Sequence, residues 1–313
     1  MIHKLINFFT NRRNLNQWKP SEEEQVSLQQ KFSIKKFNDI LVSLNISSAT
    51  PVYFQSRISN STISLTDSLE ILDCLKNLTT PKGCLLVPAF HYQGSLLSTL
   101  GSVKNFNLNT LYTTTGAIPE FFRRSANVCR SEHPINSFCA YGKMGEELIR
   151  NHAKSKYLYD EHNPISKISL LDDAICISIN APFSSYHPIH RTSSLLLDNH
   201  KFYLHKKINA NYTLENKNKS MAFYIPNEFS AYLIDMNKQI HQLNNFYEKY
   251  FLPGGFIYVY KIKKIEDHYL QNFKTENALS QFKRRRIPLA SFLGNHFYIK
   301  KHFDSIDNIL HPK

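Results

Sequence analysis

Two short segments of the chain gather the side chains that could do acid–base chemistry. "CRSEHPINSFCAYG" at residues 129–142 and "SSYHPIHR" at residues 184–191 each contain a His-Pro pair, at His133 and at His187. An imidazole with a pKa near ~6.5 can take up or release a proton at neutral pH. The proline after it favours an extended backbone, which can aim the ring out of a turn. The pattern predicts that two separate turns direct imidazoles into one pocket.

Alternating helical and extended patterns surround these two turns. Ser33 is a plausible N-cap for the first helix, and four leucines, Leu65, Leu69, Leu72 and Leu75, form the expected buried stripe of the second. The β-α-β order predicts an α/β fold with parallel pairing. The segments predicted as helices are 33–46, 64–78, 116–124 and 142–153, and those predicted as strands are 51–58, 83–90 and 174–179.

The organisation along the chain predicts three parts. Residues 1–31 are polar and are expected to be an extension outside the core, and residues 32–197 form the α/β core. After Leu197 the pattern becomes strand-like with Asn-rich loops. Residues 198–313 are therefore predicted to be a β-rich C-terminal region that completes the fold or forms a subdomain.

Composition indicates which classes of binding partner to expect. The chain has 313 residues and a formal charge of +13, which favours an anionic partner such as a coenzyme or nucleotide. It holds five cysteines and no apolar run near the ~18 residues of a spanning helix, so we expect a cytoplasmic protein without a membrane span. No nucleotide-binding glycine motif and no zinc spacing occurs, and a metal is not expected. The basic run Lys283–Arg286 lacks aromatic partners, and nucleic acid is not the expected ligand.

The segment 116–142 resembles the aminoglycoside 3-N-acetyltransferase-like family of coenzyme A-dependent acyltransferases. That family's pattern is Gly-Ala-Ile-Pro-Glu, then Phe-Arg, then Arg-Ser-x-His-Pro-x-x-Ser-Phe-x-Ala-x-Gly. The matching residues here are Gly116, Ala117, Ile118, Pro119, Glu120, Phe122, Arg123, Arg130, Ser131, His133, Pro134, Ser137, Phe138, Ala140 and Gly142. The resemblance covers roughly residues 33–197. It implies an α/β/α fold with a central mixed, largely parallel sheet, and acetyl-CoA or another acyl-CoA as cosubstrate.

The chain departs from the family pattern at two places. The family's second motif is usually Asn-Thr-x-x-His-x-x-Glu, and here Ser184 stands for the threonine, His187 for the histidine and His190 for the carboxylate. The opening His-Ser-Ser-Leu of the family becomes Gln55-Ser56-Arg57-Ile58. The resemblance implies that His187 is the general base. Since an imidazole cannot replace a carboxylate's charge, Glu120, Glu132 or an aspartate elsewhere is expected to supply it.

The other motif residues receive binding or catalytic roles. His133 and Glu120 are expected at the catalytic centre, and Arg130 and Ser137 are expected to hold substrate. Residues Ser56, Arg57 and Ser184 are expected to contact the coenzyme. The alternatives are that His133 and Arg130 are internal struts that bond backbone groups, that His190 is an exposed helix residue, and that Arg57 is solvated.

Two functions follow from the resemblance. The favoured hypothesis is an acyl-CoA-dependent N-acyltransferase that acts on an amino sugar. A nucleotide-linked amino sugar of surface-polysaccharide biosynthesis is preferred to an aminoglycoside, whose acylation would give antibiotic resistance. The alternative is a catalytically degenerate relative that binds coenzyme A or sugar as a scaffold. The oligomeric state stays open, with a homo-oligomer compatible with either hypothesis.

Overall fold

The computed structural model describes residues 19–58, 62–79, 82–92, 96–197, 203, 207–226, 232–234, 240–272 and 282–284. Residues 1–18 of the predicted N-terminal extension lie outside this range. Of the basic run Lys283–Arg286, only the first two residues are described. None of the described helices has the length and hydropathy to cross a membrane.

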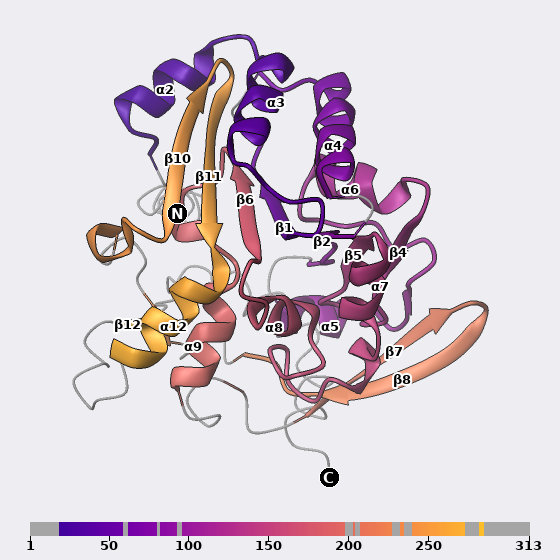
Figure 1. Ribbon diagram of the computed structural model, residues 1–313. Coiled ribbons are helices and arrows are strands. Elements are labelled where there is room, and N and C mark those ends of the chain that lie inside the picture. Colours follow the sequence, from indigo (N-terminus) through magenta and orange to yellow (C-terminus); the bar gives the residue numbers. More distant parts are fainter. Residues whose placement is uncertain are drawn as a thin grey trace, which may run out of the picture.

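A seven-stranded mixed sheet forms the centre of the protein (Figure 1). The three central strands β6, β1 and β2 pair in parallel, and the outer strands on both sides pair antiparallel. In order across the sheet, the strands are β10 (Tyr247–Leu252), β11 (Gly255–Lys261), β6 (Ile175–Ile179), β1 (Pro51–Ser56), β2 (Cys84–Pro88), β5 (Phe138–Tyr141) and β4 (Val128–Arg130). The predicted α/β fold is confirmed, although parallel pairing is confined to the centre because short connections join β4 to β5 and β10 to β11.

Helices cover both faces of the sheet, which makes three layers (Figure 1). One face is covered by α3 (Ile34–Ser43), α4 (Leu65–Thr79) and α6 (Ala117–Arg124). The other face is covered by α2 (Glu22–Gln29), α7 (Lys143–Ile149), α8 (Pro164–Ser169), α9 (Ile189–Leu196) and α12 (Ile262–Asn272). Each layer buries its own hydrophobic cluster against the sheet.

Strand β1 divides its side chains between the two clusters. Val52 and Phe54 pack with α3 and α4, whereas Tyr53 belongs to the cluster on the opposite face. Because side chains alternate along a strand, Gln55 lies on the same face as Tyr53. This alternation decides which polar groups can meet the segment that follows β6.

The predicted helices are confirmed with most of their boundaries, but the predicted buried leucine face of α4 differs in part from the observed one. Ser33 caps α3 by accepting a hydrogen bond from the backbone N–H of Lys36. In α4, however, Leu65 and Leu69 are exposed on 64% and 48% of their surface. The buried residues of that helix are Ser68, Ile71, Leu72, Leu75 and Thr79. The predicted stripe is confirmed for Leu72 and Leu75 and wrong for Leu65 and Leu69, because Ile71 completes the buried face.

Parts of the predicted N-terminal extension and of the predicted C-terminal region contact the central sheet. Segment 19–31 was expected to lie outside the core, but Leu28 of α2 is part of the main cluster and Glu24 pairs with Lys249 of β10 at 3.0 Å. Strands β10 and β11 of the C-terminal region extend the central sheet from β6. The remaining elements are α5 (Leu96–Ser102), β3 (Phe106–Asn107), η2 (His152–Lys154), η3 (Phe183–Ser185), β7 (Ile208–Leu214), β8 (Lys217–Phe223), β9 (Tyr232–Ile234), η4 (Ile240–Leu243) and β12 (Phe282–Arg284).

The Gly255→Ala substitution tests the junction between β6 and β11. An added Cβ would lie 2.0 Å from Oδ1 of Asn180, which accepts a hydrogen bond from the Phe256 N–H. The overlap should lower the free energy of unfolding by about 1–3 kcal/mol, measured by urea titration. Ala222→Ser on the exposed side of β8 is the control, and equal midpoints for both variants would contradict the junction's role.

Candidate active site

The segment that carries His187 is a short turn between strand β6 and helix α9. The chain leaves β6 at Ile179, passes through η3 and enters α9, whose N-cap residue is Pro188. Pro188 has helical backbone angles, φ −58° and ψ −18°, in agreement with its expected place at the start of a helix. His187 therefore lies at the fixed junction between two helical turns.

Gln55 holds this turn against the sheet. Its Oε1 accepts a hydrogen bond from the His187 backbone N–H at 3.2 Å. Its Nε2 donates to the Ser185 carbonyl at 3.1 Å and to the Ser178 hydroxyl at 3.0 Å. Gln55 and Ser178 are register partners in the parallel pair β1–β6. One buried amide thus ties two strands to the residue that carries the imidazole.

The His187 ring lies in an aromatic environment and shares a hydrogen bond with the hydroxyl group of Tyr53. Its Nδ1 is 3.0 Å from the hydroxyl oxygen of Tyr53. No hydrogen bond joins its Nε2 to any residue in the described ranges, and this atom keeps some solvent-accessible surface. Burial, and secondly the neighbouring His190, lower the pKa of His187 well below its usual value. The distance from the centroid of the His187 ring to that of a neighbouring ring is 5.0 Å for Phe90, 5.9 Å for Tyr53, 6.2 Å for Tyr159 and 6.3 Å for Phe138.

His190 lies beside His187, as its i+3 spacing predicts. The two ring centroids are 5.4 Å apart, and the His190 ring stacks on Tyr159 at 6.0 Å and 11°. The residue is half-buried rather than fully exposed. An imidazole thus occupies the place expected for a carboxylate, and it adds no negative charge next to His187.

His133 is enclosed in the core. It has no exposed surface, and its Nδ1 accepts hydrogen bonds from the backbone N–H groups of Ile135 and Asn136 at 3.4 and 3.1 Å. Its ring packs on His152 at 4.8 Å and on Phe223 at 4.7 Å. Burial lowers the pKa of His133 to about 3.

A second buried imidazole, His152, completes this polar network. Asn163 accepts from the Ile165 N–H and donates to the Leu158 carbonyl, so its amide nitrogen faces His152 Nε2 at 3.2 Å. Nε2 must then be the acceptor, and Nδ1–H donates to the Ser131 hydroxyl at 2.8 Å. Burial first, then nearby positive groups, hold the pKa of His152 well below its usual value. Both core histidines are therefore neutral struts between loops.

The prediction that two imidazoles share one pocket is wrong for His133. The Phe138 ring packs near both environments, with its centroid 6.3 Å from that of His187 and 5.9 Å from that of His152. The side chain of His133 cannot reach a substrate because its surroundings are closed. The strut alternative holds, since the His-Pro pair at 133 folds back on its own turn.

Arg130 and Ser137 also act inside the protein. Arg130 donates to the Ser137 hydroxyl at 2.8 Å, to the Ala89 carbonyl at 3.0 Å and to the carbonyl of Leu111. Ser137 in turn donates to the Ala89 carbonyl at 2.9 Å. Their predicted role in substrate binding is not supported, because these donors are already used. Burial lowers the pKa of Arg130 to about 10, which leaves it charged at neutral pH.

Neither glutamate proposed to support the imidazole bonds to it. Burial alone would raise the pKa of Glu120, but hydrogen bonds from Arg123, from the Thr113 backbone N–H and from Arg124 lower it to about 2. Glu132 accepts hydrogen bonds from Tyr212 and Lys219, both at 2.7 Å. The contacts of Glu120 do not support its predicted catalytic role, because its oxygens bind the arginines of its own helix.

Three residues predicted to contact coenzyme lie near the same edge of the sheet. Ser56 ends β1 and is the register partner of Ile179, the last residue of β6. Arg57 is exposed, and its backbone N–H donates to the Ile179 carbonyl at 2.9 Å. Ser184 is exposed in η3. All three border the turn that carries His187, and their roles stay a prediction.

The comparison with protein families identifies the chain. Residues 60–245, more than half of the sequence, match the aminoglycoside 3-N-acetyltransferase family. The protein belongs to that family. The matched range begins before α4 and ends after η4, so it contains the His187 turn, helices α4 and α6 of one face, and helices α7, α8 and α9 of the other.

Solved structures of this family share the fold at low identity. Aminoglycoside acetyltransferase AAC(3)-Xa superposes with a TM-score of 0.65 and 15% identity over 77% of this chain and 92% of that one. AAC-IIIb, bound to CoASH, gives 0.63 and 14% over 76% and 95%. The YokD protein of Bacillus subtilis gives 0.57 and 18% over 76% and 96%. At these identities the likeness shows the fold.

Two neighbours of His187, Tyr53 and Gln55, were not predicted as site residues. Gln55 was noted only as a departure from the aminoglycoside 3-N-acetyltransferase pattern, in the place of the family's histidine. Its spacing from Tyr53 was the available signal, because residues two apart on a strand share a face. The pairing of β1 with β6 was needed to show which residue they meet.

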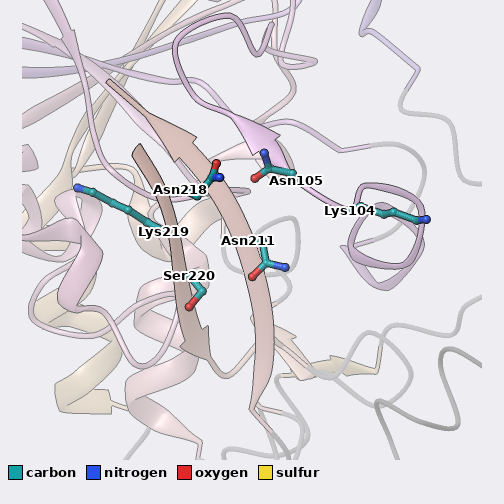
Figure 2. Close-up of a pocket in the computed structure, with 6 residues that line it drawn as sticks. All are labelled: Lys104, Asn105, Asn211, Asn218, Lys219 and Ser220. Atoms are coloured by element: carbon teal, nitrogen blue, oxygen red, sulfur yellow. The ribbon is translucent and has the colours of Figure 1, made fainter. Parts of the chain in front are cut away.

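A polar pocket of about 500 Å³ opens elsewhere, between the β7–β8 hairpin and the segment around β3. Figure 2 shows its two lysines, Lys104 and Lys219, pointing to opposite sides of the hairpin. Lys219 pairs with Glu132 at 2.7 Å. The pocket is lined by Lys104, Asn105, Asn211, Asn218, Lys219 and Ser220. None of these residues is among the described neighbours of His187, so the pocket is not part of the candidate active site.

The pH dependence of stability tests the neutral strut at His133. The pKa of His133 falls from ~6.5 in the unfolded chain to about 3 in the folded protein. The stabilisation that neutral His133 gives to the folded protein is therefore complete above the unfolded pKa and is lost as the pH falls towards 3. His133→Asn keeps an acceptor for the turn. Between pH 6 and 4, its free energy of unfolding should fall less steeply than that of the wild type, by up to about 1.4 kcal/mol per pH unit. Urea titrations at several pH values measure both slopes, and identical slopes would refute this role.

Proposed function

We propose that the protein is an acyl-CoA-dependent N-acyltransferase and that His187 assists direct transfer of the acyl group from the thioester to an amine. One observation carries the proposal. His187, at the family's second motif, is the partly exposed imidazole that Gln55 and Tyr53 fix at the edge of the sheet. Family membership and a CoASH-bound structural neighbour support acyl-CoA as the cosubstrate.

The reaction balances without a further reagent. The amine lone pair forms a bond to the thioester carbonyl carbon, and the carbonyl oxygen gains negative charge. The carbon–sulfur bond then breaks, the carbonyl reforms as an amide, and the proton that the nitrogen loses ends on the coenzyme sulfur. The protein must orient the two substrates and stabilise the charge on oxygen.

The coenzyme would approach along the edge formed by the ends of β1 and β6. Ser56 and Ser184 offer hydroxyl groups there, and Arg57 offers a cation for a phosphate. Because acyl-CoA is a cytoplasmic metabolite, this proposal also places the protein in the cytoplasm.

The acceptor that fits best is an amino sugar linked to a nucleotide rather than an aminoglycoside. The described groups around the His187 ring are aromatic rings and a second imidazole, and none of them is a carboxylate. Aromatic walls suit a base or sugar ring, whereas a polycationic drug requires acidic partners. The formal charge of +13 agrees with anionic substrates.

Thiol release tests the transfer. The protein is incubated with acetyl-CoA and a panel of amines, including nucleotide-linked amino sugars and aminoglycosides, and free coenzyme A is titrated. His187→Ala should lower the rate about 100-fold or more, because it removes the group at the reaction centre. His162→Ala, a partly exposed histidine of another loop, is the matched control.

Two outcomes would contradict the proposal. An unchanged rate in His187→Ala would remove His187 from the mechanism. Coenzyme A binding, measured by calorimetry, with no thiol release for any amine would instead favour a non-catalytic binding protein.

A further inference from the structure

The buried hydroxyl group of Tyr53 carries one hydrogen atom that needs a hydrogen-bond acceptor. The side chain is completely buried, and burial raises the pKa of Tyr53 well above its usual value, so it stays a neutral phenol. Within the described part of the chain, its one hydrogen bond is to Nδ1 of His187, at 3.0 Å. If Nδ1–H were the donor, the phenol hydrogen would be buried without an acceptor, at a cost of about 1–3 kcal/mol. The arrangement that satisfies both groups has Tyr53 donating to Nδ1.

This donation fixes the tautomer of His187. A neutral imidazole carries a single hydrogen, so an accepting Nδ1 requires the hydrogen on Nε2. The titratable groups that face the ring are Tyr53, Tyr159 and His190, and the other contacts come from Phe90 and Phe138. None of these supplies a negative charge that would stabilise an imidazolium. The hydrogen of the ring is therefore on Nε2, and no described residue forms a hydrogen bond with this nitrogen.

We infer that Tyr53 is a positioning residue that makes His187 a hydrogen-bond donor instead of a general base, so that the acceptor amine must reach the site already neutral. The inference about the reaction rests on the proposed transfer, whereas the tautomer does not. Nε2–H would donate to the thioester carbonyl oxygen as negative charge develops on it, without giving up its proton. The proton lost by the amine still ends on the coenzyme sulfur, so the reaction stays balanced.

The donor role selects a class of acceptor. An imidazole without a free lone pair cannot deprotonate an ammonium, so the rate depends on the fraction of amine that is already uncharged. Amines beside electron-withdrawing groups, such as ring amines of sugars or aromatic amines, keep a larger uncharged fraction at neutral pH than simple alkylamines do. The site should prefer such weakly basic amines to strongly basic ones.

Nitrogen NMR of the ¹⁵N-histidine-labelled protein tests the tautomer without any turnover. His187→Gln identifies the His187 signals by their loss. At pH 7 we expect a protonated Nε2 and an unprotonated Nδ1. Tyr53→Phe keeps the ring but removes the donor, and it should shift His187 towards the Nδ1–H form. Tyr186→Phe removes a buried phenol of the turn that carries His187 and should leave the tautomer unchanged. A protonated Nδ1 in the wild type, or an imidazolium at pH 7, would overturn the assignment.

The pH dependence of transfer tests the role. With acceptors of different basicity, the midpoint of kcat/KM against pH should move with each acceptor's own ammonium pKa, and Tyr53→Phe should lower kcat about tenfold with little change in KM. One midpoint shared by all acceptors would instead reveal an enzymic base and overturn the donor role. If no amine reacts while the Nε2–H tautomer is observed, the transferase proposal fails and the tautomer assignment stands.

Discussion

The parallel pairing of β1 with β6 fixes the position of the polar groups that hold His187. It sets Gln55 opposite Ser178 on one face of the sheet, and Tyr53 follows on that face because strand side chains alternate. It also brings the ends of both strands to one edge, where the turn after β6 begins. A shift of the register by one residue would exchange the two faces and put Val52 and Phe54 where the imidazole needs polar partners.

Among the described residues, several charged groups pair with one another and not with His187. Glu120 binds the arginines of α6, and Glu132 binds Lys219 of the β7–β8 hairpin. Directly after His190, Arg191 forms a buried pair with Glu266 of α12 at 3.0 Å, and this pair ties α9 to its neighbouring helix. A buried pair of this kind contributes little net stability, but removing one partner leaves a buried charge, so it constrains how α9 can lie. The histidine at the site consequently has neutral neighbours on a rigid support.

The two His-Pro pairs have different roles because of what surrounds them. His133 accepts two backbone N–H groups of its own turn and has no exposed surface, so it stabilises a loop crossing. The backbone of His187 is held by Gln55 instead, which leaves its ring free of its own turn. The same dipeptide thus serves as an internal strut in one loop and as the reactive candidate in the other.

Local pattern in the sequence was enough for helices α3, α4, α6 and α7, for the three central strands β6, β1 and β2, for the family resemblance and for the pairing of His187 with His190, but not for strands β4 and β5 or helices α8 and α9. The features that were predicted depend on spacing within a few residues, such as Ser33 before α3 or the three-residue step in the His187 motif. The burial of His133, the arginine partners of Glu120 and the phenol bond of Tyr53 could not be predicted in this way. They depend on which distant segments meet and on how much water each contact excludes, and only the packed sheet with its two helical layers decides both.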